Sequence, residues 1–307
     1  MTRNTRTHSR TLAAVAAAAV LTLTLAACGS ESMAGMDHGK SASAAPSGPS
    51  GHDMAGMSHG PDGMSGMGGA STGATAPGLA AEQGGYRLDG RLSGTEYRFT
   101  VTGPDGAVLT QYQPEQTKQM HFYAIRSDLS GFQHLHPTMA PDGTWTAPLA
   151  ALEPGDWRMY TSFVPGTGAG AGTGLVLSRT ANVPGAATAV PLPPAAASTT
   201  VDGYTVTVAG APKAGKAGEL TVTVSKDGQP VTDLQPYLET YAHLTAFHAG
   251  DQAFAHLHPE TRATGAGGGP TLPFHAELPA PGDWRLFLQF QTGGTLHTAA
   301  LTLNVAA

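Results

Sequence analysis

The sequence predicts an all-β protein, in which two tandem immunoglobulin-like β-sandwich modules follow a disordered N-terminal segment. Short runs rich in β-branched and aromatic residues alternate with Pro-Asp-Gly and Pro-Gly-Asp turn signals, and no amphipathic helical period accompanies them. A repeat of 122 residues relates Asp105–Pro137 to 227–259 without a gap. The 41 glycines and 23 prolines among 307 residues are typical of loop-rich β domains. Charged residues make up only 12% and the net charge is -6, so nothing indicates a nucleic-acid partner.

Residues 1–27 have the pattern of an export signal. Three arginines within residues 1–10 precede an apolar run over 11–25, which is too short for a convincing membrane span. The run ends in Leu-Ala-Ala-Cys at Cys28, which resembles the bacterial lipoprotein signal, in which the peptide is cut before a cysteine that is then lipidated. The alternative is an ordinary signal peptide that ends near Ala27. We expect a protein on the extracytoplasmic face of the cell membrane, anchored through lipid on Cys28 alone. Since Cys28 is the only cysteine, internal disulfides and thiolate metal clusters are excluded.

Residues 28–85 are predicted to be a disordered tail, because Gly, Ser, Ala, Pro, Met and His cannot bury enough apolar surface to offset ordering entropy. Six methionines form three M-x-G-M units, and three histidines stand among them. These candidate ligands are Met33, Met36, His38, His52, Met54, Met57, His59, Met64 and Met67. Thioethers suit Cu(I) and imidazoles suit Cu(II), so this segment is predicted to bind copper in either redox state. The alternative is a low-complexity tether in which methionine is merely tolerated.

Residues 86–183 are predicted to be the first module. The expected strands are 86–91, 95–102, 107–111, 119–126, 131–136, 144–149, 156–163 and 174–183, separated by turn signals. Seven or eight short strands in about 100 residues favour a Greek-key sandwich of immunoglobulin type. The proline-rich residues 184–200 are predicted to be a stiff linker.

The second module, residues 201–307, repeats this plan. Both modules contain Pro-Gly-Asp-Trp-Arg, and we expect Trp157 and Trp284 to fill the cores.

The repeated feature with chemical potential is His-Leu-His-Pro, preceded in each module by a lone strand histidine. If 119–126 and 131–136 form a hairpin around residues 127–130, opposed residues have numbers that sum to 257. Because side chains alternate faces along a strand, His121, His134 and His136 then project from one face. The second module repeats the arrangement with His243, His256 and His258. Three neutral imidazoles make a plausible site for copper, with zinc as the weaker competitor. The alternative for any one of them is a hydrogen-bonded packing residue.

Other histidines and methionines differ between the modules. His248 has odd spacing from the triplet and is expected on the opposite face, whereas the directions of His275 and His297 depend on strand pairing. In the first module Met139 follows His136 closely enough to be a thioether candidate, although filling core gaps is the commoner role of methionine.

Taken together, the lipoprotein signal, the Met/His tail and the paired His-Leu-His-Pro modules resemble exported actinobacterial heavy-metal-binding lipoproteins of copper-resistance type. That resemblance implies metal handling at the cell surface and exchange with a membrane or surface protein. It supplies no further ligands.

Three functions compete on the sequence. The first is a copper-binding lipoprotein that sequesters or delivers the ion. The second is a surface interaction protein whose modules bind a partner and whose histidines only pack. The third is a three-histidine metalloenzyme; it is disfavoured because no carboxylate accompanies His-Leu-His-Pro at the same place in both copies to act as a base. We therefore expect a non-enzyme.

Overall fold

The computed structural model describes residues 78–307, all of which belong to one compact unit. The predictions for the signal peptide, for Cys28 and for the Met/His ligands of the tail lie outside this range. Every regular element in the described part is a β-strand, which confirms the all-β class. Residues 78–307 contain no helix able to cross a membrane.

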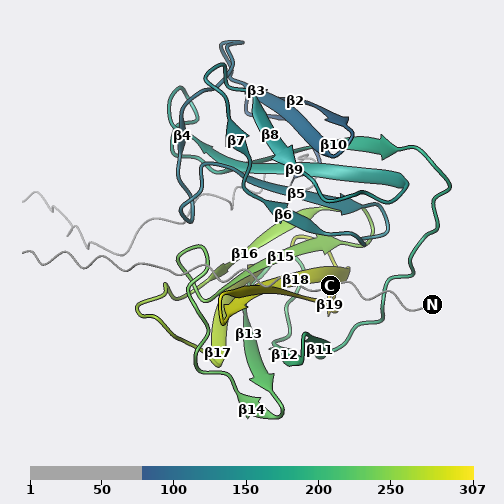
Figure 1. Cartoon of the computed structure of the whole chain (residues 1–307), viewed down its shortest axis with the longest axis vertical. Coiled ribbons are helices and arrows are strands. Elements are labelled where there is room, and N and C mark those ends of the chain that lie inside the picture. Colours follow the sequence, from purple (N-terminus) through teal and green to yellow (C-terminus); the bar gives the residue numbers. More distant parts are fainter. Residues whose placement is uncertain (1–77) are drawn as a thin grey trace, which may run out of the picture. The chain divides into compact units, whose positions relative to one another are not determined.

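The first module is a sandwich of two antiparallel sheets (Figure 1). One sheet has the order β1-β2-β3-β8-β7, from Glu82–Gln83, Tyr86–Ser93, Glu96–Thr102, Trp145–Pro148 and Thr138–Met139. The other has the order β10-β9-β5-β6, with β4 also pairing with β9, from Leu175–Val183, Gly155–Pro165, His121–Arg126, Gln133–Leu135 and Tyr112–Gln113. Side chains that alternate along each strand meet between the sheets, where Phe99, Phe122 and Trp157 belong to one buried cluster.

In the second module the strands form one continuous path, β11-β12-β13-β17-β16-β15-β18-β19, with β14 on β13. These strands are Ser198–Val201, Tyr204–Ala209, Ala217–Lys226, Thr271–Glu277, Phe254–Pro259, Ala242–His248, Gly282–Thr292, Thr295–Val305 and, for β14, Gln229–Pro230. The end of β16 crosses from β15 to β17, where His258 pairs with His275. Trp284 is fully buried in the core of this module, as expected.

The histidine-bearing sheets of the two modules pack against each other. A third buried cluster contains Tyr123 and Ile125 from β5 together with Phe247, Phe254 and Phe287 from the second module. All six residues of β5 are therefore buried, because one face meets its own sandwich core and the other meets the second module. Both faces of β5 carry apolar residues because both faces are buried.

Among the departures from the expected strands, two concern residues 107–111 and the residues before Tyr86. Within residues 107–111 only Val108 forms a β-bridge, with Thr102. The reason is that this segment crosses from one sheet to the other, where Tyr112 pairs with Pro165 of β9. The predicted disordered tail, residues 28–85, is also too long at its C-terminal end, because Glu82–Gln83 form β1 and pair with β2. The Ala80 carbonyl accepts from the Ser178 amide, and the Leu79 carbonyl accepts from Arg158.

Candidate metal centre

The hairpins have the register that the sequence predicts. Tyr123 lies opposite His134, and the numbers of this pair sum to 257. In the second hairpin Thr245 lies opposite His256, which corresponds to the same offset. The three histidines of each module therefore share a face of their sheet, and this is the face that meets the other module.

The duplicated pattern predicts a separate three-histidine site in each module, but the imidazoles of both modules lie in one cluster. The set whose nitrogens all fall within 4.8 Å of one another is His121, His134 and His243, so it takes ligands from both modules. Ring centroids of His134 and His243 are 4.7 Å apart, and those of His243 and His256 are 4.5 Å apart. The ring centroids of His136 and His134 are 4.8 Å apart, and so are those of His258 and His256.

His121 and His134 take part in three hydrogen-bond contacts, but as neutral rings they carry only two N–H protons between them. Three contacts run in series: the Glu115 carbonyl to His121 Nε2 at 3.0 Å, His121 Nδ1 to His134 Nε2 at 3.1 Å, and His134 Nδ1 to Gln289 Oε1 at 2.6 Å. Both ends of the series are acceptors, and two neutral imidazoles carry only two N–H protons. When each end receives its proton, two lone pairs face each other across 3.1 Å. A cation between them resolves this repulsion.

The distance between the facing nitrogens fits a shared metal ion. Histidine nitrogens lie about 2.0–2.1 Å from a bound zinc ion, and we take a similar distance for copper. Two nitrogens that bind the same ion are therefore roughly 3 Å from each other. The outer N–H groups would then be held by a backbone carbonyl and a side-chain amide, as the second shell of metal-bound histidines commonly is.

Burial keeps the imidazoles neutral, which is the form that coordinates metals. His121 is 1% exposed and His243 is 0% exposed. Burial, with a smaller contribution from neighbouring imidazoles, lowers the pKa of His134, His243 and His256 well below the usual value. It lowers the pKa of His121 to about 4.

Several ring nitrogens at the interface have no hydrogen-bond partner within residues 78–307. They are both nitrogens of His256, Nδ1 of His243, Nδ1 of His258 and Nε2 of His136. A buried polar atom without a partner costs about 1–3 kcal/mol. A metal ion is the kind of partner that would satisfy several of them at once.

The remaining candidates lie away from this cluster. Met139 packs against the core of the first module, which is the commoner role of methionine. His248 points to the opposite face as predicted, where it forms a hydrogen bond with Asp251 and its ring lies 5.0 Å from that of Trp284. His297 is bonded to Asp202 and Thr292. His275 is exposed beside His258.

Three residues of the centre were missed in the sequence. The Gln289 side chain forms a hydrogen bond with His134, and the Glu115 carbonyl forms one with His121. The Tyr123 hydroxyl lies 3.2 Å from His243 Nε2. A glutamine inside the apolar run Leu-Gln-Phe of a late strand was the available signal for Gln289. Nothing in the sequence singles out the Glu115 carbonyl.

Comparisons with known proteins add little about function. A family described as "Domain of unknown function (DUF8832)" matches residues 199–307, the second module. No curated protein matches the chain.

Among solved structures, a red sea bream transglutaminase is 12% identical with a TM-score of 0.20. The match covers 74% of this chain and 32% of the transglutaminase, so the chain spans about a third of that protein's length. A titin fragment is 13% identical over 71% of this chain and 92% of its own, with a TM-score of 0.17. A putative membrane-anchored protein from Corynebacterium diphtheriae is 9% identical over 76% and 58%, with a TM-score of 0.19.

Proposed function

We propose that this protein is an exported, lipid-anchored lipoprotein that binds a heavy-metal ion, copper in the first place, between its two β modules. The observation that carries the proposal is the pair of imidazole nitrogens 3.1 Å apart whose outer nitrogens both face acceptors. With the Gln289 amide oxygen facing His134, two neutral rings cannot satisfy all three contacts, whereas one cation between the rings can.

The surroundings of His121, His134 and His243, called the metal trio below, favour metal binding rather than catalysis. His121 and His243 are almost completely buried, so a bound ion would have little open coordination space for a substrate. We therefore propose sequestration of the ion, or its delivery to a membrane or surface protein, with zinc as the competitor.

Copper is preferred because of the ligands offered by the whole chain. The cluster supplies imidazoles, and the tail adds the six methionine thioethers and three imidazoles named above. Thioethers favour Cu(I) and have little use for Zn(II), and Cu(II) exceeds Zn(II) in the usual order for imidazole sites. The isolated tail is thus expected to bind Cu(I) at a strength that hardly changes with pH.

Metal analysis and electron paramagnetic resonance of the Cu(II)-loaded mature protein test the proposal. We expect nitrogen hyperfine lines from several imidazoles, and we expect His121→Ala with His134→Ala to remove the tight site. His248→Gln is the matched control, because this histidine lies outside the cluster and bonds Asp251. Unchanged copper affinity after the double substitution would favour the alternative, a surface interaction protein whose histidines only pack.

A further inference from the structure

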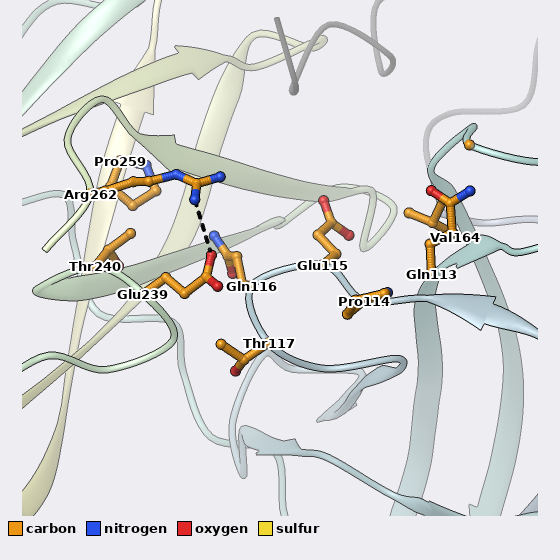
Figure 2. Close-up of a pocket in the computed structure, with 11 residues that line it drawn as sticks. Gln113, Pro114, Glu115, Gln116, Thr117, Val164, Glu239, Thr240, Pro259 and Arg262 are labelled. Carbon is orange, nitrogen blue, oxygen red and sulfur yellow. Dashed lines mark ion pairs between the residues drawn. The ribbon is translucent and has the colours of Figure 1, made fainter. Parts of the chain in front are cut away.

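A cleft of about 370 Å³ lies beside the buried histidines, between two corresponding turns of the repeat. Figure 2 shows Glu115, Gln116 and Thr117 of the first module along this cleft, with Glu239, Thr240 and Arg262 of the second module. Each turn is closed by reciprocal backbone hydrogen bonds, between Glu115 and Lys118 and between Tyr237 and Thr240. The cleft therefore stands where the two modules meet.

The two turns have the same unusual backbone. Gln116 and Thr117 have φ angles of 45° and 70°, and the residues 122 positions later have 53° and 66°. Side chains other than glycine seldom adopt this conformation, and strained turns of this kind cluster at functional sites. Both copies of the repeat thus keep a strained turn at the cleft.

Two residues that line the cleft carry buried polar atoms without hydrogen-bond partners among the described residues. The side chain of Gln116 is 8% exposed, yet neither of its amide atoms has a hydrogen-bond partner in the described part of the chain. The buried Oε2 atom of Glu115 likewise has none there. Carboxylate and amide oxygens are ligands for cations, so this wall of the cleft offers a place where a positive ion would be held.

The same turn is joined directly to the metal trio. The Glu115 carbonyl accepts from His121 Nε2, so a residue that lines the cleft also contacts the first histidine of the centre. His121 is 1% exposed, and an ion needs a route to reach it.

We infer that this cleft is the port through which the metal ion reaches the histidine cluster, and that the Glu115 carboxylate is its first protein ligand before His121. This inference rests on the proposed function. On the opposite wall, the Glu239–Arg262 ion pair spans 3.8 Å and is exposed, so Arg262 is free to move away as a cation enters.

The test is the rate of Cu(II) binding to the full mature chain, in a background with His38, His52 and His59 replaced by glutamine to silence the imidazoles of the tail. Stopped-flow quenching of tyrosine fluorescence reports loading, since the Tyr123 ring lies 4.4 Å from that of His134. With Glu115→Gln we expect association and dissociation rates to fall together by about tenfold, because the focusing charge is lost while the bound state is unchanged. Equilibrium affinity should stay the same.

Two further variants keep the result interpretable. Glu260→Gln removes an exposed charge next to Pro259 of the cleft, and its loading rate should stay close to that of the parent. Glu115→Asp, which retains a carboxylate, should recover most of the rate, and this recovery would exclude misfolding as the cause.

The outcomes separate the port from the proposed function. If the parent binds Cu(II) and Glu115→Gln loads at the parental rate, the port is overturned and the metal site stands. Lower affinity with an unchanged association rate would also overturn it, since Glu115 would then be a ligand of the bound ion. If the parent with the silenced tail binds no Cu(II), the proposed function fails and the port fails with it.

Discussion

At the scale of single residues, the hydrogen bonds behind the histidines matter as much as the histidines themselves. Gln289 holds His134 Nδ1 at 2.6 Å, and this contact selects the tautomer whose Nε2 lone pair faces His121. A ring held in this way loses little orientational freedom when a metal binds.

Replacing Gln289 by leucine should therefore weaken metal binding without unfolding the protein. Phe287, two positions earlier on the same face of the strand, is apolar and buried in the intermodule cluster, so the new side chain has a compatible neighbour. Loss of an outer partner typically lowers metal affinity by about 10- to 100-fold. Chelator competition with Cu(II) measures this, and Gln291→Leu on the same strand is the control. Equal affinities for the two variants would show that Gln289 does not position His134.

At the scale of elements, an ion pair and hydrogen bonds within the loop stabilise the hairpin that carries His134. Arg126, which is 6% exposed, pairs with Asp128, and Asp128 also accepts from Ser130 and from the Val190 amide. Burial favours the neutral form of Asp128, but the hydrogen bonds from Arg126 and Ser130 outweigh it and lower the pKa of the carboxyl group. The loop and the intermodule segment are thereby tied together.

Asp128→Asn should destabilise the protein strongly, because it leaves the buried Arg126 charge uncompensated. Breaking such a pair by removing one partner costs about 3–5 kcal/mol. Urea unfolding measures the loss, with Asp142→Asn in an exposed turn as the control, for which we expect only a small effect. A similar loss in both variants would contradict a special role for the Arg126 pair.

The N-terminal boundary gives a second prediction for an element. A chain that starts at residue 78 should unfold at the same temperature as the mature chain in the absence of metal. A chain that starts at Gly84 should unfold at a lower temperature, because it loses β1 and the Ala80–Ser178 hydrogen bond. Scanning calorimetry of the three chains checks this, and equal values for all three would show that residues 78–83 do not stabilise the fold.

At the scale of the whole molecule, the clustered imidazoles make stability depend on pH. The folded-state pKa is about 4 for His121 and about 3 for His136, below the ordinary value of 6.5. The unfolded chain therefore binds more protons between these values, so stability is fully present above about pH 6.5 and is lost as pH falls toward 4.

Thermal unfolding of the metal-free protein should thus occur at lower temperature at pH 5 than at pH 7. His256→Met should reduce this dependence, because one buried imidazole with a lowered pKa is removed. Added Cu(II) should raise the unfolding temperature at pH 7, since the ion binds the folded state. An unfolding temperature that is flat from pH 7 to pH 5 would contradict neutral buried histidines.

By itself the sequence determined the fold class, the duplication and the register of both hairpins. Turn signals and period-two alternation are local, so residues 119–136 alone place His121, His134 and His136 on one face. The same local rule places His248 on the opposite face.

Only the tertiary structure decided what that face meets. In β5 both faces carry apolar residues, so the sequence did not reveal which face enters the sandwich and which contacts another surface. Packing of one module against the other brings His243 to His121 and His134, and brings Gln289 to His134 across 155 positions of the chain. Contacts between modules depend on the complementary shapes of two folded surfaces, and no local pattern in either strand encodes them.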